Sequence, residues 1–212
     1  MNKITKEQEN FLNECTDGIW RLNAETGLVD VDGHFNCSRM GLSDFMGIEF
    51  GNISGSFNCS NNKLVSLKVA PKKVGKSFYC YNNQLVSLEG GPQEVGVAFY
   101  CYNNKLVSLE GAPQEVGGDF YCYNNQLVSL EGAPQEVGGD FNCYNNKLAS
   151  LEGAPKKVGW GLICDAITLR GCPIDLLDKI YFYRYDKSFI LKDLLNRVVN
   201  GLAPEIYLKK ML

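Results

Sequence analysis

The chain has 212 residues, of which 45% are hydrophobic and 21% are charged, and its formal net charge is −3. This composition is ordinary for a globular protein with a core of its own. The charge gives no general attraction to nucleic acid or anionic lipid, so we expect neither as a partner. No run of about 18 or more apolar residues occurs, which excludes a membrane-spanning helix. The polar N-terminus lacks the apolar stretch of a secretory signal, so the sequence predicts a cytoplasmic protein.

Residues 1–34 are predicted to form an N-terminal cap of one helix and two short strands. Thr5 is the expected N-cap of a helix from Thr5 to Glu14, with its hydroxyl accepting from the first helical turn. The inward side chains of this helix would be Phe11, Leu12 and Cys15. Turns expected at Asp17-Gly18 and Thr26-Gly27 would bound two short strands, 19–22 and 28–31.

A repeat with a period of 21 residues follows the cap and determines the predicted architecture. Nearly constant copies begin at Phe78, Phe99, Phe120 and Phe141, divergent ones at Phe35 and Phe57, and a degenerate one near Leu162. Within one copy the apolar positions are Phe99, Cys101, Leu106, Leu109 and Val116. Phe99 and Cys101 alternate with tyrosines, and this period of two indicates a strand with one buried face.

A second asparagine in each copy stands three residues after the cysteine: Asn62, Asn83, Asn104, Asn125 and Asn146. This spacing reproduces the leucine-rich-repeat skeleton L-x-L-x-x-N-x-L, with Phe and Cys in the first two Leu positions. A buried amide there can satisfy backbone groups that leave the strand ladder. The sequence therefore predicts a mainly β, right-handed leucine-rich-repeat solenoid of about seven coils over residues 35–172, with a parallel β-ladder.

Residues 35–172 resemble two groups of leucine-rich-repeat proteins. Prolines in the second half of each copy are similar to those in the short repeats of bacterial effector proteins. The repeated motif Asn-Asn-Gln/Lys-Leu-x-Ser-Leu-Glu-Gly-Ala-Pro more closely resembles the repeats of proteins encoded by tailed bacteriophages and some bacteria. The resemblance implies a recognition scaffold, and for a phage protein it implies binding and neutralising a host protein, such as an antiviral defence component, in the host cytoplasm.

The return stretch of each copy carries a proline, Pro113 in the copy that begins at Phe99. A unit of 21 residues with proline in its second half has no room for a full helix, so extended or short 3₁₀ structure is expected there. Most of the 9 cysteines follow the same period, without a Cys-x-x-Cys pair and with His34 as the single histidine. We expect reduced core thiols and neither disulfides nor a bound metal.

Residues 173–212 are predicted to form a helical C-terminal cap. Pro173 is placed at the first turn of a helix, and segments 174–183 and 187–200 each carry an apolar face. A third short helix is expected to follow Pro204. These helices would cover the last coil, and they are also a possible binding surface.

The outer face of the predicted strands carries the residues expected to bind a partner. These are Tyr79, Tyr81, Tyr100, Tyr102, Tyr121, Tyr123 and Tyr144, with Asp119 and Asp140 towards the C-terminal coils. Tyrosine is enriched at binding hot spots, and this face is the concave one in such solenoids. The alternative interpretation is that the rings stack along the ladder and stabilise the sheet.

No catalytic residues are expected, because the sequence lacks a phosphate loop, a nucleophile elbow and a plausible triad. Glutamates on the return stretches are interpreted as a solvated acidic surface. The sequence therefore predicts a non-enzymatic module that binds a protein, without a cofactor. Two alternatives remain open at this stage: a small-ligand or nucleotide binder that uses the aromatic face, and a structural assembly component. Neither the partner nor the oligomeric state follows from the sequence.

Overall fold

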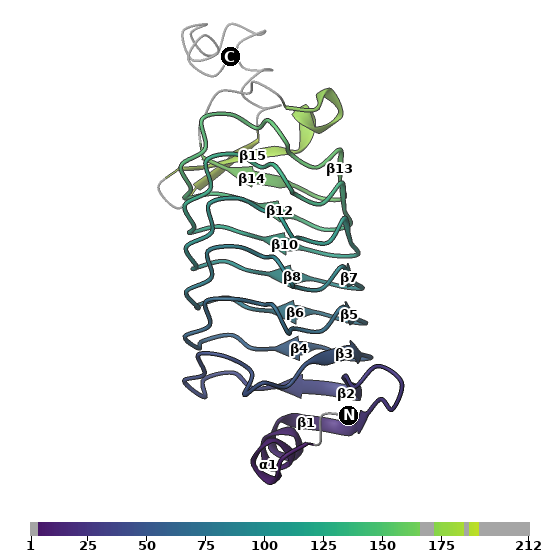
Figure 1. Ribbon diagram of the computed structural model, residues 1–212. Helices are drawn as coiled ribbons and strands as arrows, with labels where there is room; N and C mark the ends of the chain where they lie inside the picture. The colour runs from purple at the N-terminus through teal and green to yellow at the C-terminus, as the bar shows by residue number, and fades with distance from the viewer. Residues whose placement is uncertain (1–3, 166–171, 185–186, 191–212) are drawn as a thin grey trace, which may run out of the picture.

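A computed structural model describes residues 4–165, 172–184 and 187–190. These residues form a parallel β-solenoid of about 7 turns, with a single α-helix at the N-terminal end (Figure 1). The predicted mainly β solenoid is thereby confirmed. The described part of the chain contains no helix long and apolar enough to cross a membrane.

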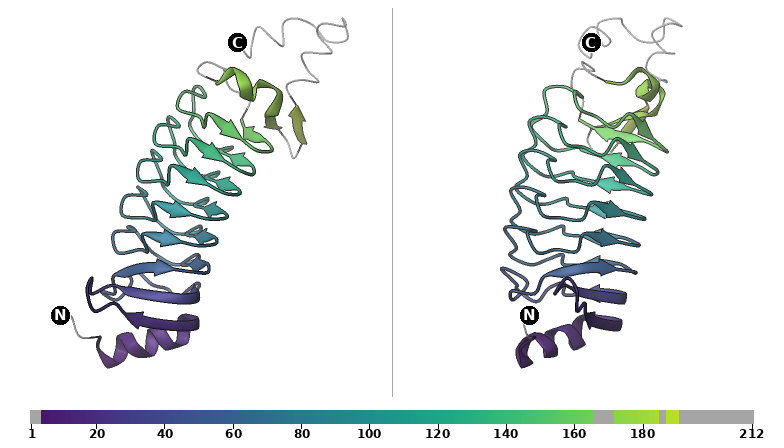
Figure 2. Two further views of the ribbon diagram at one scale, coloured as in Figure 1. Left: turned by 90° about the vertical axis from the view of Figure 1, so that its right-hand side faces the viewer. Right: turned by 45° about the vertical axis from the view of Figure 1, so that its right-hand side comes forward.

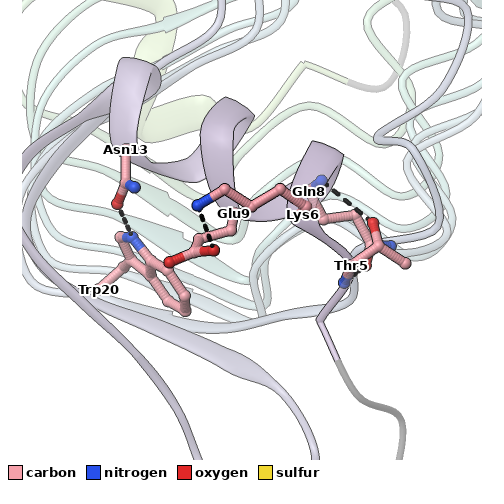
Figure 3. A network of polar contacts seen from close by, with 6 residues as sticks. All are labelled: Thr5, Lys6, Gln8, Glu9, Asn13 and Trp20. Atoms are coloured by element: carbon pink, nitrogen blue, oxygen red, sulfur yellow. Dashed lines mark hydrogen bonds and ion pairs between the residues drawn. The ribbon is translucent and has the colours of Figure 1, made fainter.

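Helix α1 (Lys6–Cys15) closes the N-terminal end of the solenoid, as predicted. Thr5 is its N-cap: the Thr5 hydroxyl accepts from the Gln8 N–H, and the Gln8 side chain accepts from the Thr5 N–H. Phe11, Leu12 and Cys15 are buried against the first coil. Figure 3 shows polar contacts of this helix, including the bond from Trp20 Nε1 to Asn13 Oδ1 at 2.7 Å.

Strands β1 (Thr16–Leu22) and β2 (Val29–Asn36) form an antiparallel hairpin that follows the helix without a loop. Both strands are longer than predicted, and the turn predicted at Asp17-Gly18 is wrong because these residues pair with His34 and Gly33 inside the hairpin. Gly18 faces Gly33 so closely that a Cβ on Gly18 would lie 2.9 Å from the Gly33 Cα. The glycine therefore permits close backbone approach within a strand and does not mark a turn.

Two parallel ladders diverge from β2, whose first half pairs with β3 and whose second half pairs with β4 (Figures 1 and 2). The phenylalanine ladder continues through β4 (Phe57–Asn58), β6 (Phe78–Tyr79), β8 (Phe99–Tyr100), β10 (Phe120–Tyr121), β12 (Phe141–Asn142) and β14 (Leu162–Cys164). The Glu-Val ladder continues through β3 (Phe50–Ile53), β5 (Lys73–Val74), β7 (Glu94–Val95), β9 (Glu115–Val116), β11 (Glu136–Val137) and β13 (Lys157–Val158). The sequence predicted extended structure on the return stretch but not this second ladder.

The core between the ladders consists of repeated side chains stacked on their own copies. Phe99 and Phe120 stack with ring centroids 5.2 Å apart, and the equivalent rings continue this stack along the solenoid. Eight of the nine thiols are buried and Cys172 is half-buried, and all nine are free. Burial raises the pKa of these thiols, to about 12 for Cys15, and Glu14 adds to the rise. The cysteines therefore act as small apolar core residues, as predicted.

The second asparagine of each copy performs the predicted role. Asn83 Nδ2 donates to the carbonyls of Cys59 and Cys80, at 3.0 and 3.1 Å, and its Oδ1 accepts from the Leu64 N–H at 3.0 Å. Asn104 repeats these contacts one coil further along. Each such amide joins two coils at the point where the backbone leaves the phenylalanine ladder.

The C-terminal end differs from the predicted helical cap. A 3₁₀ helix, η1 (Ile174–Lys179), leads into β15 (Ile180–Arg184), which pairs parallel with β14 and antiparallel with β16 (Lys187–Ile190). The helices predicted over 174–183 and 187–200 are therefore wrong for residues 180–183 and 187–190. The open edge of β14 offers backbone hydrogen bonds, and pairing with this edge overrides the local helical periodicity. The predicted helical residues from 191 onward lie outside the described residues.

Candidate functional site: the tyrosine face

The seven tyrosines selected from the sequence all lie on the outer side of the phenylalanine ladder or directly after it, and all are half-buried. Their positions follow from strand alternation, because Phe99 and Cys101 point inward and are fully buried while Tyr100 and Tyr102 point outward. Parallel pairing in register then sets Tyr100 beside Tyr79 and Tyr121. We call this surface, with Asp119 and Asp140, the tyrosine face.

The tyrosines form two stacked columns that run along the solenoid. The rings of Tyr81, Tyr102, Tyr123 and Tyr144 have centroids 4.5, 4.4 and 5.2 Å apart and are nearly parallel. The rings of Tyr79, Tyr100 and Tyr121 are 5.3 and 5.0 Å apart and are tilted. The stacking foreseen in the alternative interpretation is therefore present. Because neighbouring rings cover one another's faces, the solvent contacts mainly ring edges and hydroxyl groups.

The hydroxyl groups in the middle of these columns, those of Tyr121 and Tyr102, have raised pKa values. Partial burial raises the pKa of Tyr121 to about 12, and the carboxylates of Asp119 and Asp140 add to the rise. Burial also raises the pKa of Tyr102, followed by the effects of its stacked neighbours Tyr123 and Tyr81. Tyr121 and Tyr102 therefore present neutral phenols, and a neutral phenol can donate a hydrogen bond.

Asp119 and Asp140 occupy the same position in adjacent coils, immediately before the inward phenylalanine. Asp119 Oδ1 accepts from the Asp140 N–H at 2.9 Å, and Asp119 Oδ2 accepts from the Tyr100 hydroxyl at 3.3 Å. Burial raises the pKa of Asp140; the Gly161 N–H lowers it in part, and the charge of Asp119 raises it. Both carboxylates therefore contact the backbone or tyrosines of their own face.

The first asparagine of each copy borders the tyrosine face in an arrangement that the sequence did not reveal. Asn61, Asn82, Asn103, Asn124 and Asn145 all have positive φ angles between 52° and 56°. From Asn82 onward, each side-chain amide donates to the amide oxygen of the asparagine one coil earlier, at 2.6 to 2.8 Å. Asparagine tolerates the left-handed conformation, which was the available signal for this turn. The resulting amide ladder fixes one edge of the face.

A second surface feature, a groove of about 1010 Å³, runs along the Glu-Val ladder. Its glutamates were predicted to form a solvated acidic surface, and two of them are paired with lysines at the ends of the ladder: Lys73 with Glu94 and Lys157 with Glu136, both at 2.6 Å. These four side chains are exposed, so the pairs contribute little to stability. Within the described residues no group of three or more His, Cys, Asp or Glu side chains is placed to hold a metal ion.

Comparisons of the chain with protein-family models, with curated proteins and with solved structures found no match.

Proposed function

We propose that this chain is a non-enzymatic recognition module that binds a protein partner through its tyrosine face. The observation that supports this proposal is the double column of stacked tyrosines, whose half-buried rings are held in fixed positions by their neighbours. A side chain that is already ordered loses little conformational entropy on binding. A surface that combines apolar ring edges with hydroxyl donors resembles the hot spots of protein interfaces.

The stacking geometry argues against the alternative of a nucleotide or sugar held between the rings. A planar ligand between two rings needs them about 7 Å apart, which is twice the usual contact distance between carbon atoms. The columns have spacings of 4.4 to 5.3 Å, so such a ligand would have to separate rings that already contact each other. A protein surface can instead lie across the ring edges without disturbing them.

The proposal is tested by comparing three forms of the tagged protein in affinity purification from bacterial lysate. The binding variant carries alanine at Tyr100, Tyr102, Tyr121 and Tyr123. The control variant carries alanine at Val65, Val86, Val107 and Val128, which are 52 to 62% exposed in another column of the same solenoid. Thermal melting of all three forms shows whether they are folded.

We expect the wild type and the valine variant to retain one protein that the folded tyrosine variant does not retain. After purification, this protein should bind the wild type directly. A partner that the folded tyrosine variant still retains would refute the proposal. A fourth form, with phenylalanine at the same four positions, separates the hydroxyls from the rings. The more specific expectation of a host defence protein rests on the phage resemblance alone, and the identity of the captured protein decides it.

A further inference from the structure

The tyrosine face has an uneven distribution of charge along the solenoid. In the column before the inward phenylalanine, the N-terminal coils carry His34, Ser56, Ser77 and Ala98, whereas the next two carry Asp119 and Asp140. Asp165 follows Tyr144 in the second tyrosine column. The outward positions of this face from residue 34 to residue 165 contain no lysine or arginine. One end of the face is therefore polar and uncharged, and the other is anionic.

The fold does not require these two negative charges. The carboxylate of Asp119 accepts a hydrogen bond from the N–H of the next coil, at Asp140. In an earlier coil the Ser56 hydroxyl accepts from the Ser77 N–H in the same way, and His34 Nδ1 accepts from the Ser56 N–H. A neutral side chain thus accepts the same hydrogen bond elsewhere in the solenoid. The contact between coils therefore does not require a negative charge at Asp119 or Asp140.

In the described part of the chain, neither carboxylate belongs to an ion pair. The ion pairs of the described residues join Lys6 to Glu9, Lys73 to Glu94 and Lys157 to Glu136, and none includes Asp119 or Asp140. Like charges at the same position of adjacent strands repel each other. The elevated pKa of Asp140 is consistent with this repulsion and with partial burial. A cation placed between the two carboxylates would remove the repulsion.

Aromatic side chains lie beside the carboxylate pair. Tyr121 lies close enough to both carboxylates for their charges to raise its pKa. A Cβ on Gly161 would lie 2.7 Å from the Tyr181 ring and 3.2 Å from Asp140 Oδ1, so the ring and the carboxylate meet above this glycine. Trp160, the preceding residue, is 69% exposed. Aromatic groups beside carboxylates provide apolar contact for the stem of a long basic side chain.

We infer that the protein partner presents an arginine or lysine side chain to Asp119 and Asp140, and that this contact sets the direction in which the partner lies along the tyrosine face. This inference rests on the proposed function. The basic part of the partner lies over the coils that begin at Phe120 and Phe141, and its apolar or neutral part lies over the earlier tyrosines. Complementary charge of this kind selects orientation and speeds association more than it adds affinity.

The inference is first tested with a defined probe, a fluorescently labelled tetra-arginine amide peptide, by anisotropy at low ionic strength. The test variant is D119N/D140N, because asparagine keeps an acceptor for the backbone N–H of the next coil. The control is E110Q/E131Q, which removes the same charge at exposed positions on the return stretches that lead into these two coils. We expect the test variant to bind the peptide about tenfold more weakly, or about 1.4 kcal/mol, and the control to bind like the wild type.

Equal weakening by both variants would show a response to net charge alone and would overturn the inference, as would a wild type that does not bind the peptide. The same variants are then compared in the affinity purification from lysate, after thermal melting has shown that their melting temperatures equal that of the wild type. A partner lost from the four-tyrosine variant but held by D119N/D140N would leave the proposed function standing and refute the charged subsite. A partner held by the four-tyrosine variant would refute the proposed function itself.

Discussion

Replacing Asn83 with alanine should destabilise the whole solenoid, because this one side chain connects two coils through well-formed hydrogen bonds. The substitution removes the two donated bonds to the Cys59 and Cys80 carbonyls and the accepted bond from Leu64, all at 3.0 to 3.1 Å. Each net hydrogen bond is worth about 1 kcal/mol, and a buried group left without a partner costs about 1 to 3 kcal/mol. We therefore expect a loss of about 3 to 5 kcal/mol.

The measurement is urea unfolding followed by circular dichroism, in the presence of a reductant that keeps the nine thiols free. The matched control is Gln84→Ala at the next residue, which is exposed and accepts only a weak bond from Lys105 at 3.4 Å. This control should change the free energy of unfolding by less than about 0.5 kcal/mol. A loss below about 1 kcal/mol for Asn83→Ala would mean that water replaces the amide, and the reasoning would fail.

Three further predictions concern backbone space, pH and the N-terminal cap. Gly96→Ala should lower the free energy of unfolding by about 2 to 3 kcal/mol, because the added Cβ would lie 2.2 Å from the Gly75 carbonyl oxygen. Gly27→Ala should lower it by about 1 kcal/mol, because this glycine has a φ of +73° but no atom within 4 Å of the added Cβ. Thermal melting compares the two variants, and equal losses would contradict this account. The stability that Tyr121 contributes through its raised pKa of about 12 should be fully present below the ordinary tyrosine pKa of 10 and be lost as the pH rises towards 12, because the unfolded chain loses this phenolic proton first. Tyr121→Phe should therefore make the fall in the free energy of unfolding between pH 10 and pH 12 less steep, and an unchanged fall would contradict the assignment. Thr5→Ala should cost about 1 kcal/mol and increase amide exchange in α1, whereas Thr5→Ser should retain protection.

The repeat made most of the fold predictable, because one coil determines the next. Phe99, Cys101 and Leu106 are fully buried as their spacing indicated, and Thr5 caps α1 as expected. The Glu-Val ladder was missed because two-residue strands leave no periodicity that a sequence can reveal. At the C-terminal end, Leu176 and Ile180 have helical spacing, but pairing with β14 decides the conformation of Ile180. This pairing depends on an edge that exists only after the solenoid has formed.

The tyrosine face was predictable in its membership but not in its detailed contacts. Strand alternation alone placed Tyr100 and Tyr102 outward, and both lie there. The ring geometry depends on the spacing between coils. The sequence therefore could not predict that the rings of one column are nearly parallel and those of the other are tilted. The bond from the Asp140 N–H to Asp119 was also hidden, since it joins residues 21 positions apart at a bend between the two ladders. Such a contact requires the coil register, which only the folded chain defines.

The regular spacing of the contacts between coils has a consequence for the length of the molecule. Phe120 pairs with Phe99, and Asn124 bonds to Asn103, through the same 21-residue step that relates neighbouring copies from Phe57 onward. Loss of residues 99–119 would therefore join Ala98 to Phe120 and leave both ladders, the amide ladder and the cysteine column in register. A deletion one residue shorter would shift the strand register by one residue and turn the inward side chains outward. The chain can thus gain or lose whole coils, and each coil changes the length of the tyrosine face by about 4.8 Å. Loss of residues 99–119 would also remove Asp119 and leave Asp140 as a single carboxylate in its column.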